Sequence, residues 1–221
     1  FEPDVTKSLA VAYLESGRGI DAASEFEKVA ARPTETREVR RAALWQAAEL
    51  YEKSKSMVPA ASAFAAYVQQ YPQPFDAAMD ARQRLADIAE SNHDTRLRQR
   101  WLQEIVLADQ AAGAARNDRS RYLAARATLV LVEPEVASFN SIRLAVPLAK
   151  SLKAKRAAME RVLSAYGKAL DYQVAEVTTA ATFGMAEAYR QLGSDLLASE
   201  RPKDLDADAR EQYDVLLEEQ A

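Results

Sequence analysis

A residue pattern that recurs every 38 positions constrains the fold of this chain more than any other feature. It occurs three times, and the matching positions are Tyr13, Tyr51 and Ala89, then Ala22, Ala60 and Arg98, then Phe26, Phe64 and Leu102, and finally Val29, Tyr67 and Ile105. A fixed period of this length is typical of stacked repeats, in which each unit buries its apolar face against the next. We therefore predict an all-α solenoid of antiparallel helix pairs.

The residue types at these positions narrow the repeat class. The second copy runs Leu44, Ala47, Ala48, Tyr51, Ala60, Phe64 and Pro72, and the first runs Leu9, Ala10, Tyr13, Ala22, Phe26 and Pro33. Both resemble the tetratricopeptide repeat, with its pattern W-x2-L-G-x2-Y, A-x3-F, P, although the leading aromatic is missing. The third copy keeps the apolar positions Leu85, Ala86, Ala89, Leu102 and Ile105, but has Arg98 at the small-residue position and no closing proline. The resemblance implies three such helix pairs over residues 1–113 and a helical extension over 114–221.

Small and large residues have separate tasks in such a repeat. Ala22 and Ala60 are expected where two helix backbones approach closely, and the phenylalanine four residues later lies one turn further along the same face. Pro72 is expected to end its helix, because proline forces the preceding residue out of the helical region. Short polar turns are predicted at residues 17–19, 54–57 and 91–94.

The repeat register is lost after a helix predicted over residues 116–132. Glu133-Pro134-Glu135 and the stretch 138–141 are expected to interrupt that helix. A long helix is predicted from about Leu144 to Leu170, because its apolar residues recur at intervals of three, four and seven. A second long helix over 173–199 has an apolar stripe that includes Ala188 and Tyr189. We expect these two helices to form a large antiparallel hairpin.

The two ends of this C-terminal region carry opposite charge. Between Ile142 and Lys168, along the first long helix, the chain has seven bases against Glu160 alone, namely Arg143, Lys150, Lys153, Lys155, Arg156, Arg161 and Lys168. The tail from Ser199 has eight acids against three bases, and the acids are Glu200, Asp204, Asp206, Asp208, Glu211, Asp214, Glu218 and Glu219. Such charge runs usually form solvated helix faces. The alternative is that the tail packs near the basic face, formed by Lys150, Lys153, Arg156 and Arg161, or that one of the two binds a partner.

Composition and motifs argue against several functional classes. No run approaches the roughly 18 apolar residues of a membrane helix, and the net charge of −4 disfavours nucleic acid as a ligand. His93 is the sole histidine and lies in a predicted turn, cysteine is absent, and no phosphate-binding glycine motif occurs. We therefore expect no enzymatic activity, no cofactor and no metal site. The chain begins at Phe1, and we interpret it as a piece of a longer protein.

The first helices of the second and third pairs suggest a binding surface. Placed on the inner side of a tetratricopeptide array, their side chains make an acidic groove of Trp45, Glu49, Glu52, Asp80, Gln83, Asp87 and Glu90, with Lys53 beside it. Such a groove favours a basic or amphipathic protein segment. The carboxylate-binding variety of the family uses lysine and asparagine, and this chain offers Lys7 and Lys53 without the asparagines. Trp45 has an alternative role in packing between units.

A further resemblance concerns the C-terminal residues. The stretches Ala180–Tyr189, Leu196–Leu205, Glu211–Tyr213 and Leu216–Gln220 resemble the C-terminal half of bacterial cell-envelope tetratricopeptide proteins that accompany gliding-motility and Tol- or TonB-like machinery. That resemblance implies a periplasmic or outer-membrane-associated protein-binding scaffold. The alternative is a structural module that self-associates through its C-terminal hairpin.

Overall fold

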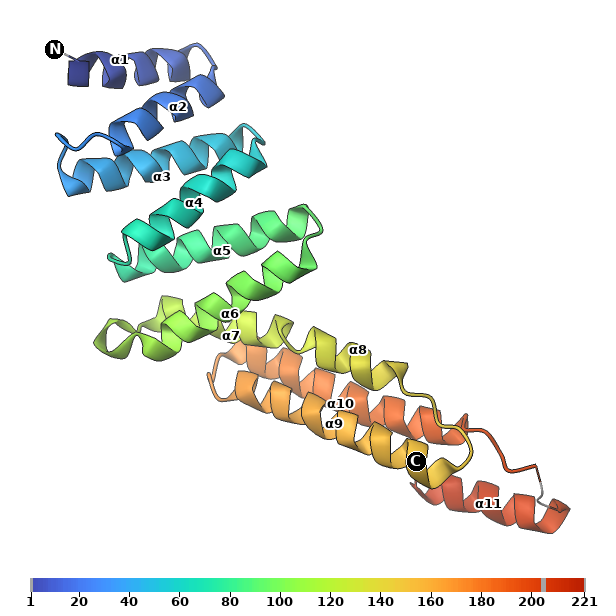
Figure 1. The fold of residues 1–221 in the computed structure, drawn as a ribbon. Helices are drawn as coiled ribbons and strands as arrows, with labels where there is room; N and C mark the ends of the chain where they lie inside the picture. The colour runs from blue at the N-terminus through green and yellow to red at the C-terminus, as the bar shows by residue number, and fades with distance from the viewer. Residues whose placement is uncertain (1, 204–205, 221) are drawn as a thin grey trace. The chain divides into compact units, whose positions relative to one another are not determined.

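The computed structural model describes residues 2–203 and 206–220, with side chains from Ser8 to Lys203 and from Asp206 to Glu219. Within these ranges all regular structure is helical, as predicted (Figure 1). The helices are α1 (Glu2–Glu15), α2 (Gly19–Ala30), α3 (Arg37–Lys53), α4 (Met57–Gln70), α5 (Phe75–Ser91), α6 (Thr95–Ala111), the short 3-10 helix η1 (Gly113–Ala115), α7 (Asp118–Val130), α8 (Glu133–Ser141), α9 (Leu148–Leu170), α10 (Ala175–Leu197) and α11 (Ala207–Gln220). The chain forms two compact units, Phe1–Ser120 and Arg121–Ala221, whose boundary lies inside α7.

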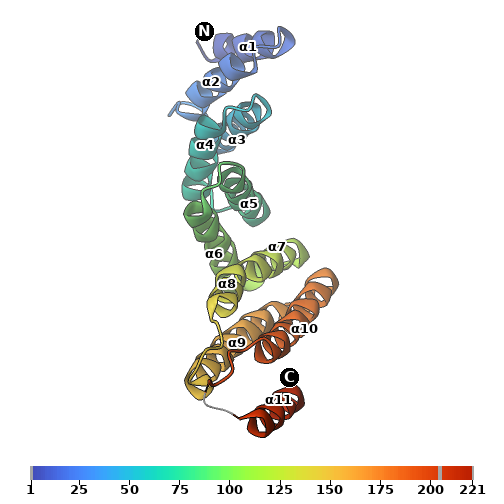
Figure 2. The same cartoon turned by 90° about the vertical axis from the view of Figure 1, so that its right-hand side faces the viewer.

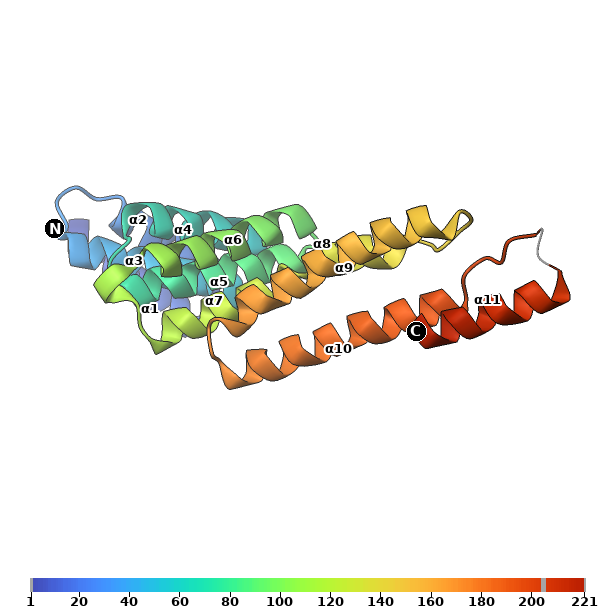
Figure 3. The ribbon, with the colours of Figure 1, turned by 90° about the horizontal axis from the view of Figure 1, so that it is seen from below.

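In the first unit, each of the helices α1 to α6 packs against its neighbours in the chain. Two perpendicular views show α1, α3 and α5 in one layer and α2, α4 and α6 in the other (Figures 2 and 3). We call the surface formed by α1, α3 and α5 the odd-helix face. Adjacent helix pairs stacked in two layers are consistent with the predicted α-solenoid.

The backbone repeats as regularly as the side chains do. Gly17, Lys55 and His93, each 38 residues from the next, have positive φ angles of 73°, 58° and 57°. In each turn the following amide donates to the carbonyl of the matching repeat position: Arg18 N to Tyr13 O at 2.8 Å, Ser56 N to Tyr51 O at 2.8 Å and Asp94 N to Ala89 O at 2.9 Å. This is the glycine-type ending of an α-helix, which satisfies carbonyls that the helix leaves free. The third copy therefore has the same turn as the first two.

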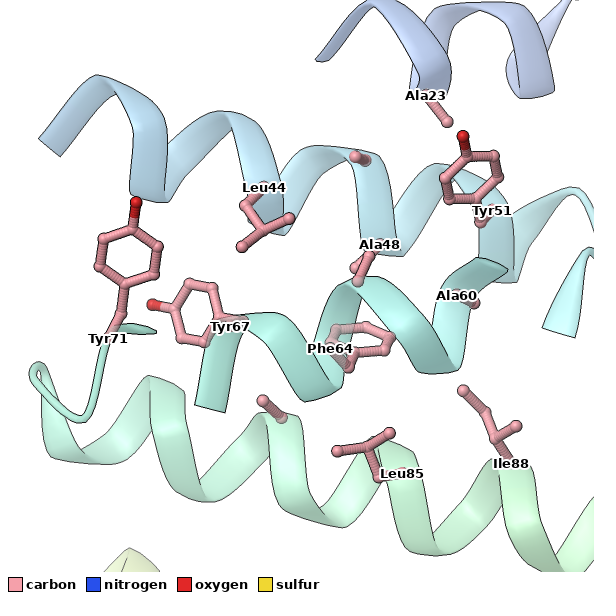
Figure 4. Close-up of a cluster of buried hydrophobic side chains, with 13 residues drawn as sticks. Ala23, Leu44, Ala48, Tyr51, Ala60, Phe64, Tyr67, Tyr71, Leu85 and Ile88 are labelled. Carbon is pink, nitrogen blue, oxygen red and sulfur yellow. The ribbon is translucent and has the colours of Figure 1, made fainter. Parts of the chain in front are cut away.

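Alanine and phenylalanine pack as the repeat pattern predicts. Ala22, Ala60 and Phe64 are fully buried, whereas Phe26 is only half-buried. Figure 4 shows the Phe64 ring between the helices that carry Ala48 and Leu85. Ala48, Ala60, Phe64 and Leu85 belong to one apolar cluster that extends from α2 to α5, and Phe26 packs against it. The apolar face of the second repeat is thus buried against side chains of the third.

Tyr51 connects two repeats through a polar contact. Its buried hydroxyl donates to Glu27 Oε2 of α2 at 2.8 Å. Burial, together with the hydrogen bond to this carboxylate and its charge, raises the pKa of Tyr51 to about 12. The repeat position therefore contributes a hydrogen bond as well as an aromatic ring.

The second unit contains the predicted long hairpin, with corrections at its start. The stretch 138–141 does not interrupt a helix: it ends α8, where the buried Phe139 holds it against α9. Helix α9 begins at Leu148, after Pro147, and not at Leu144. Leu144 lies before the helix and packs with Leu196 and Leu217. The turn between α9 and α10 has Gln173 at a φ of 56°.

The structure agrees with only part of what was predicted for the charged segments. Lys150, Lys153, Arg156 and Arg161 are exposed, as expected for a solvated face, and Arg161 pairs with Glu135 at 3.0 Å. The prediction that Lys155 belongs to a solvated helix face is wrong, because Lys155 is fully buried. Helix α11 packs against α10 through Leu217. Asp204 of the acidic tail lies outside the described residues.

Candidate functional site

Trp45, the aromatic residue of the predicted groove, packs inside its own helix pair. Its ring meets Phe64 edge-on at a centroid distance of 5.5 Å and Tyr67 at 5.0 Å, both on α4. This arrangement is typical of aromatic core contacts. The geometry therefore favours the packing role of Trp45 over the binding role.

The predicted acidic residues lie beside arginines that the sequence prediction left out. Glu52 of α3 pairs with Arg84 of α5 at 3.0 Å, and Asp80 pairs with Arg119 at 2.8 Å. Glu90 pairs instead with Arg98 of α6 at 3.1 Å. The first two pairs bridge successive odd-numbered helices, so the surface is less acidic than predicted.

Other predicted residues keep more of their acidic character. Asp87 accepts a hydrogen bond from Gln83 Nε2 at 2.7 Å, one helical turn away. Glu49 and Asp87 have no ion pair with a lysine or arginine among the described side chains. Lys53 is exposed, and Lys7 lies outside the described side chains. The structure thus brings Glu49, Glu52, Gln83 and Asp87 onto the odd-helix face of α3 and α5.

A second site, absent from the sequence prediction, is an apolar groove in the second unit. Its volume is about 470 Å³. Helices α7 and α8 supply one wall with Leu129, Val130, Glu133, Val136, Phe139 and Asn140, α9 supplies the floor with Val162 and Tyr166, and α10 supplies the other wall with Ala180, Phe183, Gly184, Glu187, Ala188 and Gln191. We call this the α8–α10 groove. The spacing of small and apolar residues on α10 was the available sequence signal.

Two aromatic residues of α10 are more exposed than its apolar pattern indicates. Phe183, in the groove wall, is 68% exposed, and Tyr189, outside the groove lining, is 58% exposed. The prediction that Tyr189 belongs to the apolar stripe is therefore wrong. Exposed aromatic rings on one helix are common where a protein surface meets a partner.

Gly184 leaves room for the Tyr166 ring at one point of the groove. A Cβ atom built on Gly184 would lie 2.3 Å from Cζ of Tyr166 and 2.4 Å from its hydroxyl oxygen. Such distances are far below van der Waals contact, so the Tyr166 ring occupies the space that any other side chain would need. Burial and the charge of Glu133 raise the pKa of the Tyr166 hydroxyl.

Buried Lys155 holds the end of α8 in place. Its Nζ donates to the carbonyl oxygens of Phe139 and Ile142, both at 2.9 Å, and lies 2.5 Å from Asp195 Oδ2. The contact with Asp195 joins groups of opposite charge and is therefore an ion pair. The ammonium group also lies 4.3 Å from the centre of the Phe139 ring. One lysine therefore joins α8, α9 and α10.

Neither site contains a recognisable catalytic constellation. His93 occupies a left-handed turn position, and no group of histidines and carboxylates suited to a metal ion occurs among the described residues. None of the helices in the described ranges combines the length and apolar character needed to span a membrane. A scan against models of known protein families and a search of characterised proteins give no match.

Proposed function

We propose that this protein is a non-enzymatic scaffold of the tetratricopeptide type, which binds a segment of another protein. In this proposal it acts in a bacterial envelope complex, in the periplasm or at the outer membrane, as the C-terminal sequence resemblance implies. Stacked helix pairs present extended surfaces that suit protein ligands. The fold alone does not identify the ligand, so the proposal depends on a specific surface.

The observation that carries the proposal is the arrangement of carboxylates on the odd-helix face. The Glu52–Arg84 ion pair joins α3 and α5, which belong to successive repeats, at 3.0 Å. Glu49 and Asp87 add two carboxylates that no described lysine or arginine pairs with. A basic or amphipathic segment would complement this surface in charge.

A crosslinking pull-down from native envelopes at low and high salt tests the scaffold function. The informative variant is Glu49→Lys combined with Asp87→Lys, which leaves the packed Trp45 intact. We expect the variant to lose the partners that the wild type captures at low salt, because lysines replace two carboxylates that would attract a basic segment. High salt should weaken capture by the wild type, since salt screens surface charge pairs. Unchanged capture with an intact helical spectrum would contradict the proposal. The matched control is Glu211→Lys with Glu219→Lys, two exposed acids on α11.

Self-association through the C-terminal helices is the second candidate, and two complementary surfaces favour it. Helix α11 exposes Val215 and Leu216 among its acids. Helix α9 has a shallow hollow of about 480 Å³ lined by Ala149, Leu152, Lys153, Arg156, Ala157 and Glu160. Sedimentation velocity separates the two candidates. A dimer that the Glu211→Lys, Glu219→Lys control dissociates would favour self-association, whereas a wild-type monomer at tens of micromolar would contradict it.

A further inference from the structure

The α8–α10 groove has the form of an unoccupied helix position. Helix α9 packs against both α8 and α10, which leaves the groove between these two helices above the α9 floor. Figure 1 shows α8, α9 and α10 running alongside one another. A further helix laid in the groove would complete a four-helix arrangement, in which each helix buries an apolar stripe against the others.

The lining residues recur at helical intervals on both walls. On α10, residues 180, 183, 184, 187, 188 and 191 follow the spacing of a helix seam, and on α7 and α8 residues 129, 133, 136 and 140 do the same. The α10 wall is therefore about 16 Å long, which is about three helical turns. A compact small molecule would leave much of this length and the exposed Phe183 ring uncovered, whereas a helix would cover both.

The charged residues of the two walls determine which charge a bound helix should carry. Glu133 lies on one wall and Glu187 on the other, and the described lining contains no lysine or arginine. Arg190 pairs with Glu187 at 2.8 Å from outside the lining, and this hydrogen bond lowers the pKa of Glu187. A second copy of the same surface would bring glutamates against glutamates, so like charges disfavour it. A helix with lysine or arginine beside its apolar stripe is attracted by the carboxylates of Glu133 and Glu187.

We propose that the α8–α10 groove binds an amphipathic, basic α-helix of a partner protein. The helix places apolar side chains at i, i+3, i+4, i+7 and i+11 against Val136, Tyr166 and Phe183, and basic side chains toward Glu133 and Glu187. This site differs from the odd-helix face in position and in ligand form. Its apolar lining contributes affinity, and its two carboxylates contribute orientation.

The test uses a fluorescent probe helix of about 14 residues, which is about four turns, with leucine at the stated spacing and lysine beside it. Binding to the full chain is measured by anisotropy. A second probe has glutamate in place of lysine, and a third has the same composition with the spacing scrambled. We expect the lysine probe to bind, the other two to bind at least about tenfold more weakly, and added salt to weaken binding.

Two exposed aromatic residues of α10 supply matched variants. Phe183→Ala removes a groove residue and should weaken the lysine probe about tenfold. Tyr189→Ala removes a ring of similar exposure outside the lining and should change affinity less than about twofold. Arg190→Gln should strengthen binding further, because it removes a positive charge beside Glu187. Both Glu49→Lys and Asp87→Lys should leave the probe unaffected.

Several outcomes would overturn the proposal. These are failure of the lysine probe to bind, equal binding of the glutamate or scrambled probe, and equal effects of Phe183→Ala and Tyr189→Ala. A dimer in sedimentation velocity that Phe183→Ala dissociates and Tyr189→Ala does not would instead assign the groove to a second copy of this chain.

Discussion

The two units use the same residue types in different ways. In the first unit Phe64 follows the small residue Ala60 by one turn and is fully buried, because α3 and α5 cover it. In the second unit Phe183 lies beside Ala180 and Gly184, yet it is 68% exposed. The comparison teaches that small and aromatic residues at helical spacing predict a close helix contact without showing whether the chain itself supplies the second helix.

The backbone shows the same contrast. Three turns of the first unit repeat one hydrogen-bond pattern at Gly17, Lys55 and His93, so the first helix of each pair ends in the same way. The second unit depends on single, unrepeated devices, of which the Lys155 network is the clearest. A repeated unit spreads its stability over many equivalent contacts. In the second unit we expect a few contacts, such as those of Lys155, to contribute more of the stability.

The largest expected effect compares the two phenylalanines directly. Phe64→Ala should lower the free energy of unfolding by about 4 kcal/mol, because it leaves a cavity in a closely packed core. Phe183→Ala should change it by less than about 0.5 kcal/mol, as for other surface substitutions. Chemical denaturation measures both values, and hydrogen exchange should show lost protection in α3 to α5 for Phe64→Ala. Similar costs for the two variants would remove the contrast between the units.

The second-largest effect on stability concerns the Lys155 contacts of the second unit. Lys155→Met should cost about 3 kcal/mol, because it leaves two buried carbonyls and the Asp195 carboxylate without their cation. Asp195 is partly exposed, which limits the loss. Adding Asp195→Asn should recover part of the cost, and denaturation of both variants measures it. If Lys155→Met is neutral, the methylene chain and not the ammonium group holds α8.

A smaller effect of about 1 kcal/mol is expected for Tyr51→Phe, which removes the hydrogen bond to Glu27. The pH dependence gives a sharper test. Because the folded-state pKa of Tyr51 is about 12 against 10.0 for the free side chain, its contribution is fully present below pH 10 and is lost as pH rises toward 12. Stability should therefore fall less steeply between pH 10 and pH 12 in Tyr51→Phe than in the wild type. Identical slopes would contradict the assignment.

The smallest expected effect is that of Arg84→Gln on the odd-helix face. Arg84 and Glu52 are both partly exposed, so their ion pair should contribute about 0.5 kcal/mol or less to stability. Binding of a basic partner segment should nevertheless tighten, because Glu52 loses its internal partner. Denaturation and the envelope pull-down measure the two quantities separately. A large loss of stability would show that the odd-helix face is structural.

Periodicity predicted the first unit better than the second. Recurring side chains located the helix pairs, the turns and the burial of Ala22, Ala60 and Phe64. The pattern did not reveal that Lys55 and His93 adopt left-handed backbone conformations, because neither is glycine. It placed Lys155 on a solvated face, since a count of charges does not detect the Asp195 partner forty residues away. The sequence pattern did not predict the α8–α10 groove, because tertiary packing alone determines the spacing of the helices that form its walls.

The contact between Gly184 and Tyr166 has a consequence for how the groove can change. The Tyr166 ring forms part of the floor only because residue 184 has no side chain. A single nucleotide change converts a glycine codon into an alanine codon, and the added methyl group would push the ring from its place. Descendants of this gene therefore have a one-step route to a groove of different shape, without rebuilding any helix.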